Sequence, residues 1–162
     1  MSLIVPEFLY HGSAEAFSHV DVRKGRPYKD FGKGFYLTDI RSQAVQLAEK
    51  KAKLFKGMPI VQMYEFDETV LHSPDYKVLL FETPTREWAE FIYKNRNRDS
   101  HFHHDYDIVY GPIANDGVAY LLGRFEEGTL TLDELTKELQ FRELNNQYFF
   151  GTEKSIKLLK RI

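Results

Sequence analysis

The chain has 162 residues, which suits one domain with a sizeable hydrophobic core. Its 22 basic and 24 acidic residues give a formal net charge of −2, so no strong nucleic-acid-binding or membrane-binding field is expected. The absence of cysteine excludes disulfides and a thiol nucleophile, and neither a secretory signal nor a membrane-spanning run is recognisable, so we expect a cytoplasmic protein without membrane partners.

The first half of the chain is expected to form four short strands, over 8–11, 35–37, 60–66 and 78–81. The segment between the first two strands, 21–34, is rich in charge, glycine and proline, and this composition predicts a loop. A helix is expected from Arg41 to Lys56, with Thr38 or Asp39 as its cap. One side of this helix is predicted to carry Ala44, Leu47, Ala48, Lys51 and either Leu54 or Phe55.

The second half mixes helices, strands and loops. A helix is predicted to open at Thr83-Pro84 and to end near 95–97, and a polar loop then extends to Asp105. Further elements are expected as a strand over 106–110, helices over about 118–125 and 131–140, a strand over 148–150 and a last helix over 153–160 capped by Thr152. This order favours a single α+β domain over residues 1–162 rather than an alternating parallel sheet.

Three short segments place a polar residue on, or at the mouth of, an apolar strand: 9–13 (LYHGS), 32–38 (GKGFYLT) and 146–150 (NQYFF). In the first two, glycine allows a ligand to approach the backbone closely. Together they resemble the His–Tyr–Glu signature of the ADP-ribosyltransferase superfamily, in the branch of diphtheria toxin and the poly-ADP-ribose polymerases. The strings 28–38, 107–116 and 147–154 resemble a bacterial, DUF3990-like subfamily, so the resemblance extends in order from residue 9 to about 160.

The resemblance implies a fold with a split, bent β core and flanking helices, and mono-ADP-ribosyl transfer from NAD with release of nicotinamide. NAD is then a substrate, no metal is required, and the acceptor is a protein, a nucleic acid or a small molecule. By that resemblance His11 orients the ribose next to nicotinamide, Gly12 and Ser13 hold the carboxamide, Tyr36 packs on the nicotinamide ring and Gln147 binds the ribose hydroxyl. Tyr10, Gly34 and Phe35 flank these motifs and are expected to line the cofactor site.

Two positions depart from the family pattern. Gln147 stands where the polymerases have glutamate, and loss of one such stabilising group typically costs a factor on the order of 10² to 10³ in rate. A glutamine also cannot act as a general base, so two alternatives stay open: an NAD- or ADP-ribose-binding module without transfer, and an NAD glycohydrolase. Glu143 is a candidate source of a carboxylate, although solvated helix-end charge is the favoured interpretation. Leu47 takes the place of a second aromatic residue, which leaves either an aliphatic wall or a replacement by Phe55 or Tyr28.

Other polar residues carry two interpretations each. The basic loop residues Lys24, Arg26, Lys29 and Lys33 are either solvated or contact the NAD pyrophosphate, because cations gain charge-assisted hydrogen bonds there. Asp107, Asn115 and Asp116 either serve a turn or face the ligand. The segment 101–105 (HFHHD) has neither ligand spacing nor a second cluster, so a polar loop is favoured over a metal site.

Overall fold

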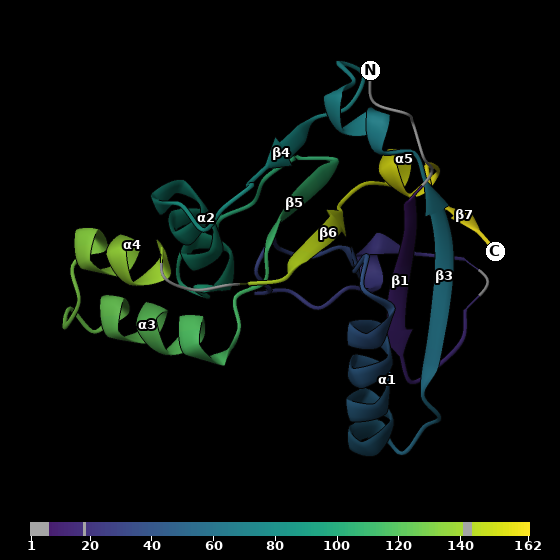
Figure 1. Ribbon diagram of the computed structural model, residues 1–162, viewed down its shortest axis with the longest axis horizontal. Helices are drawn as coiled ribbons and strands as arrows, with labels where there is room; N and C mark the ends of the chain where they lie inside the picture. Colours follow the sequence, from purple (N-terminus) through teal and green to yellow (C-terminus); the bar gives the residue numbers. More distant parts are fainter. Residues whose placement is uncertain (1–6, 18, 141–143) are drawn as a thin grey trace.

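The computed structural model describes residues 7–17, 19–140 and 144–162. Within these residues five α-helices and two β-sheets give a mixed α+β structure, as the order of predicted elements indicated. Figure 1 shows the helix α1 next to the smaller sheet, while α2, α3 and α4 gather beside the larger one.

The smaller sheet is antiparallel, with the order β1 (Glu7–Ser13), β3 (Ile60–Phe66) and β7 (Lys160–Arg161). One of its faces is covered by α1 (Arg41–Phe55), whose buried residues are all alanines: Ala44, Ala48 and Ala52. A side chain at Gly12 would place its Cβ 2.1 Å from the carbonyl oxygen of Ala44. The glycine in β1 therefore allows the helix backbone to approach the sheet.

The larger sheet has the order β2 (Phe35–Leu37), β6 (Asn146–Phe150), β5 (Ile108–Pro112) and β4 (Val78–Leu80). Because side chains alternate along a strand, each strand contributes to two separate hydrophobic clusters. Tyr36, Val109 and Phe149 pack toward α2 (Arg86–Arg96), α3 (Asp116–Glu126) and α4 (Leu132–Gln140). On the opposite face, Phe35, Ile108 and Phe150 pack against residues of the smaller sheet, including Leu9 and Tyr64.

An isolated bridge connects edge strands of the two sheets. The Tyr10 amide donates to the Thr38 carbonyl at 2.7 Å, and the Thr38 amide donates to the Tyr10 carbonyl at 2.9 Å. The bridge brings the C-terminal part of β1 next to β2. The residues of the first two sequence motifs are consequently neighbours in space.

The predicted strands 35–37 and 60–66 are confirmed with the same ends, and the helix after 41 ends one residue earlier than predicted. The last helix is wrong in its length: α5 covers Glu153–Ile156, and residues 160–161 form β7, an edge strand that pairs with β3. Two 3-10 helices, Val22–Lys24 and Glu68–His72, lack a periodic apolar pattern and were not predicted.

Cap positions also differ from the predictions. The N-cap of α1 is Ile40, which makes no side-chain cap, although the Thr38 hydroxyl accepts a hydrogen bond from its amide. The N-cap of α2 is Thr85, so the helix begins after the predicted Thr83-Pro84. On α1, Leu47, Leu54 and Phe55 are exposed, because the close packing of the helix at Gly12 admits only alanine on its buried side.

Candidate functional site

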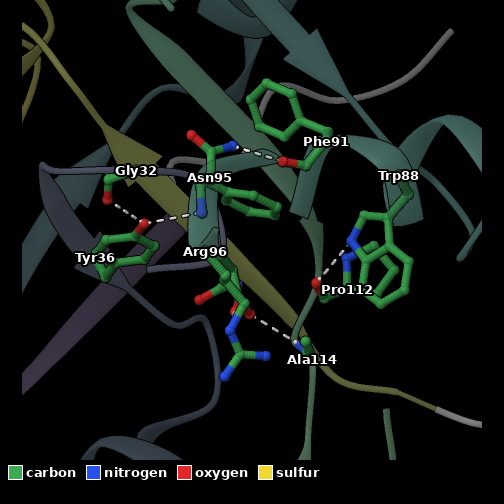
Figure 2. Close-up of polar contacts among 11 residues, drawn as sticks. Gly32, Tyr36, Trp88, Phe91, Asn95, Arg96, Pro112 and Ala114 are labelled. Carbon is green, nitrogen blue, oxygen red and sulfur yellow. Dashed lines mark hydrogen bonds and ion pairs between the residues drawn. The ribbon is translucent and has the colours of Figure 1, made fainter. Parts of the chain in front are cut away.

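A tight turn formed by residues 28–32 lies at the centre of the candidate site. The Gly32 amide donates to the Lys29 carbonyl at 3.0 Å, and Tyr28 and Gly32 adopt positive φ values of 62° and 94°. The buried Tyr36 hydroxyl donates to the Gly32 carbonyl at 2.5 Å and accepts a hydrogen bond from the Phe31 amide at 3.0 Å (Figure 2). Burial raises the pKa of Tyr36 well above its ordinary value, so the phenol stays protonated and holds the turn.

His11 is tied to the same region through the backbone of Tyr36. Since a carbonyl oxygen only accepts, the His11 Nδ1–H donates to the Tyr36 carbonyl, at 2.7 Å. The ring lies against Phe35, with ring centroids 4.4 Å apart. Burial lowers the pKa of His11 from 6.5 to about 4, and the positive charges of Lys51 and Lys29 lower it further, whereas the Tyr36 carbonyl opposes the shift. The imidazole is therefore neutral, and its Nε2 is a hydrogen-bond acceptor.

Gln147 is joined to the turn by Asp30. Its Nε2 donates to Asp30 Oδ2 at 3.1 Å, and the same oxygen accepts a hydrogen bond from the Ala114 amide at 3.0 Å. Arg96 Nε lies 3.7 Å from the other carboxylate oxygen, so Arg96 and Ala114, both labelled in Figure 2, contact the same carboxylate. Burial raises the pKa of Asp30, while the Ala114 amide, Arg96, Gln147 and Lys29 act in the opposite direction. The side chains of Tyr36 and Gln147 thus meet the same turn.

Three cations lie beside this turn. Lys29 Nζ is 5.1 Å from the centroid of the Tyr36 ring, Lys51 Nζ donates to the Gly12 carbonyl at 3.2 Å, and the Arg26 guanidinium lies 5.1 Å from the Phe55 ring. Burial lowers the pKa of Lys51 to about 8, and the charges of Lys29 and Arg26 contribute to the decrease. The pKa of Lys29 is also lowered, by burial and by Arg26. We define Arg26, Lys29 and Lys51 as the cation cluster; its members repel one another, and such a cluster attracts an anion.

The backbone of Gly12 faces the cation cluster. Tyr10 exchanges both backbone hydrogen bonds with Thr38, so the even-numbered residues of β1 direct their amides and carbonyls away from β3. Gly12 follows this alternation, and its carbonyl meets Lys51. The position that a Gly12 side chain would occupy is filled by α1, so the glycine serves helix packing while its polar groups face the cluster.

The remaining predicted site residues fall into two groups. Leu47 lies one helical turn before Lys51 and is 44% exposed, and Phe35 packs on His11, so both border the site. Ser13 and Gly34 have local structural contacts: the Ser13 hydroxyl donates to the Glu15 carbonyl at 2.7 Å, and a Cβ on Gly34 would lie 2.3 Å from the Phe149 ring. Tyr10 contributes the backbone bridge to Thr38.

Part of the basic loop lies away from the cation cluster. Lys33 and Tyr28 line a hollow of about 220 Å³ next to the loop 101–106. The hydrogen bonds from Arg23 lower the pKa of Asp21, and Lys24 makes a smaller contribution to this decrease. Tyr28 therefore does not replace the missing aromatic wall beside Leu47, whereas Phe55, under Arg26, borders the cation cluster. Glu143 lies outside the described residues.

Several residues with alternative interpretations serve the fold. The Asp107 carboxylate accepts hydrogen bonds from the Thr152 hydroxyl at 2.6 Å and from the Lys77 amide at 2.9 Å, and Asn115 is the N-cap of α3. In the loop 101–105, His104 Nε2–H donates to the Phe31 carbonyl at 2.6 Å, and so helps to hold the turn. Among the described residues, no group of three His, Cys, Asp or Glu side chains is arranged to hold a metal ion.

Sequence reasoning missed the roles of Asp30 and Gln62. Asp30 appeared only within the string 28–38, and a contact with a residue 117 positions away leaves no local signal. Gln62 is the cross-strand partner of His11 and is buried; its Nε2 donates to the Phe17 carbonyl, and in the described part of the chain its Oε1 has no hydrogen-bond partner. A polar residue at a buried position of the alternating strand 60–66 was the available signal for Gln62.

Residues 8–161 match the model of a family described as "Protein of unknown function (DUF3990)". No curated protein and no solved structure matches the chain. Of the helices in the described ranges, none combines the length and the apolar character that crossing a membrane requires.

Proposed function

The chain belongs to the DUF3990 family, whose description names no function. From the resemblance of its three motifs to those of ADP-ribosyltransferases and from the geometry around the turn 28–32, we propose that it is a mono-ADP-ribosyltransferase with an ADP-ribosyltransferase-like fold, which uses NAD and releases nicotinamide. One observation carries the proposal. Three segments far apart in the sequence, which contain His11, Tyr36 and Gln147, are joined by hydrogen bonds at one place, beside the cation cluster.

The neutral His11 supports recognition of a ribose. Its Nδ1–H is held by the Tyr36 carbonyl, which fixes the ring and leaves the Nε2 lone pair as the acceptor for a hydroxyl proton. The low pKa, about 4, keeps this acceptor available throughout the neutral range. We therefore assign His11 to the hydroxyl groups of the ribose next to nicotinamide.

The ring of Tyr36 supports recognition of the nicotinamide. Lys29 places an ammonium over this ring at 5.1 Å, so the ring face already attracts a cation. The nicotinamide of NAD is itself a positively charged aromatic ring and competes for the same face. In the proposed complex nicotinamide displaces the Lys29 ammonium, which moves toward the pyrophosphate.

The cation cluster supports binding of a pyrophosphate. Burial, together with the charges of Lys29 and Arg26, lowers the pKa of Lys51 to about 8, so a nearby negative charge would stabilise its ammonium form. Two phosphate groups supply that charge and gain charge-assisted hydrogen bonds with Arg26, Lys29 and Lys51. The near-neutral net charge of the whole chain is compatible with this assignment, because the electric field at a bound ligand comes mainly from the charged side chains closest to it.

The proposed step breaks the glycosidic bond between C1′ of the ribose and N1 of nicotinamide. The electron pair of that bond goes to N1, so nicotinamide leaves as a neutral molecule. A lone pair of the acceptor forms the new bond to C1′, and the acceptor loses its proton to water. Gln147 accepts a hydrogen bond from the ribose hydroxyl but takes up no proton, which favours acceptors that are already nucleophilic.

Two alternatives depend on the neutral side chain of Gln147. With water as the acceptor the protein is an NAD glycohydrolase, and without turnover it is an NAD-binding module. Incubation with NAD labelled in the adenosine part, with and without cell extract, separates the three. Label on a macromolecule indicates transfer, free ADP-ribose alone indicates hydrolysis, and saturable binding without nicotinamide release indicates the module.

His11→Ala, compared with the control His103→Ala, tests the assignment of the site. His103 is an exposed histidine of the loop 101–106, so its replacement should leave both activity and NAD binding unchanged. We expect His11→Ala to lower nicotinamide release by a factor on the order of 10², and thermal unfolding of both variants checks that they are folded. Equal release by a folded His11→Ala and the wild type would contradict the assignment.

A further inference from the structure

We propose that Asp30 is the acidic positioning residue of this site: it orients the amide of Gln147 toward the ligand and places behind that amide the negative charge that glutamine lacks. The inference rests on the proposed NAD chemistry and names a residue that the three sequence motifs do not include. Its basis is the hydrogen bond of 3.1 Å between Gln147 Nε2 and Asp30 Oδ2.

The carboxylate of Asp30 is held in place by groups from distant parts of the chain. Oδ2 accepts hydrogen bonds from Gln147 and from the Ala114 amide, and Oδ1 faces Arg96 Nε at 3.7 Å. Only 14% of the side chain is exposed to solvent. An acidic group with this little solvent has a defined orientation, and its charge is weakly screened.

Asp30 determines which end of the Gln147 amide faces outward. A carboxylate only accepts hydrogen bonds, so the NH₂ group of Gln147 must face Asp30, and Oε1 is directed away from it. A glutamine without such a partner samples both orientations. With Asp30 present, Oε1 is a preorganised acceptor for a ribose hydroxyl, in the role that one oxygen of a glutamate plays.

Asp30 also restores part of the missing electrostatic stabilisation. The ribose becomes positively charged as nicotinamide leaves, and a negative charge nearby lowers the energy of that state. The hydrogen bond to a carboxylate polarises the amide and makes Oε1 a stronger acceptor. Arg96, whose Nε is 3.7 Å away and whose side chain is 37% exposed, and Lys29 offset part of this charge.

A purely structural role is the competing explanation, since Asp30 also anchors the turn 28–32 through the Ala114 amide. A reciprocal exchange of the two side chains separates these roles. Asp30→Asn removes the charge and allows the Gln147 amide to reverse. Gln147→Glu places two carboxylates about 3 Å apart, which then share one proton. The double variant Asp30→Asn/Gln147→Glu has one carboxylate again, now at position 147, and the new amide at position 30 is its donor.

The experiment measures nicotinamide release by the wild type, both single variants, the double variant and the control Asp75→Asn, an exposed aspartate of the segment before β4, across a range of pH. We expect each single variant to lose a factor on the order of 10² at neutral pH, and the double variant to recover to within about tenfold of the wild type. The pH profile of Gln147→Glu should shift to higher pH, because the shared proton must leave. The control should match the wild type.

The outcomes distinguish the two proposals. If the wild type releases nicotinamide and the folded double variant is no better than the weaker single variant, the role of Asp30 is overturned while the proposed function stands. If the wild type neither binds nor cleaves NAD, both are overturned. Recovery in the double variant, with thermal unfolding showing that both single variants are folded, supports the positioning role, because a turn anchor alone gives no reason for rescue by a carboxylate at position 147.

Discussion

Replacement of His11 by leucine tests the electrostatic description of the site without any ligand. The pKa of His11 is about 4 in the folded protein, compared with the ordinary 6.5. Between these two values the unfolded chain binds a proton that the folded protein does not bind. The contribution of the neutral His11 to the free energy of unfolding is therefore complete above about pH 6.5 and is lost as the pH falls toward 4.

The shift in pKa sets the magnitude of this effect. Each pH unit in the window changes the free energy of unfolding by about 1.4 kcal/mol, so the wild type should lose about 3 kcal/mol through His11 between about pH 7 and pH 4. His11→Leu removes the titrating group and leaves the Tyr36 carbonyl without its donor. We expect this variant to be less stable by about 1 to 3 kcal/mol at pH 7.

Denaturant unfolding of both proteins from pH 7 to pH 4 gives the difference in the free energy of unfolding. The advantage of the wild type should fall by about 3 kcal/mol over this range, so that at pH 4 the variant is as stable as the wild type or more stable, because only the wild type carries His11. His104, whose pKa is also lowered by burial, is present in both proteins and cancels. A difference that stays constant with pH, or a His11 ring that titrates near 6.5 by NMR, would refute the buried, neutral imidazole.

Three further substitutions test the packing around the site. Gly12→Ala places a methyl group 2.1 Å from the Ala44 carbonyl oxygen, so we expect a loss of about 3 kcal/mol in the free energy of unfolding and a lower thermal midpoint. Tyr36→Phe removes the hydroxyl that holds two backbone groups of the turn 28–32, with an expected loss of about 2 to 4 kcal/mol in urea unfolding. Gln62→Met removes a buried oxygen without a described partner together with the Nε2 donor to the Phe17 carbonyl, which keeps Arg161 as a donor. The thermal midpoint should therefore stay the same or rise, and a fall of several degrees would contradict this balance.

Strand and helix positions could be predicted from the sequence where a local pattern sets them. The run 60–66 alternates residues of high strand propensity and became β3 with the predicted ends. The segment 160–161 was predicted as helix because nothing local distinguishes the last turn of a short helix from a chain that turns to pair with β3. Pairing with the distant strand β3 determines that this segment is extended, and the periodicity of the sequence carries no information about such pairing.

The site shows the same division between local and distant causes. His11, Tyr36 and Gln147 could be found because each stands in a short motif. In the structure His11 contacts the Tyr36 carbonyl, and the side chains of Tyr36 and Gln147 contact the turn 28–32. The contribution of Lys51 was hidden because a lysine on a helix usually reaches solvent, whereas Lys51 extends to the carbonyl of a glycine 39 residues earlier. The sequence offers Glu143 as one source of a carboxylate near Gln147, with solvated charge as the favoured interpretation, and gives no local sign that the carboxylate of Asp30 contacts Gln147 from across the fold.

The position of β6 in its sheet has a consequence for protein synthesis. This strand lies between β2 and β5 although it follows both of them in the chain. Until the ribosome has extended the polypeptide past residue 150, β2 lacks its sheet partner, and Asp30 lacks the amide of Gln147. Nascent chains therefore emerge without an assembled centre, and whatever chemistry the protein performs begins only when translation of the last strands is complete.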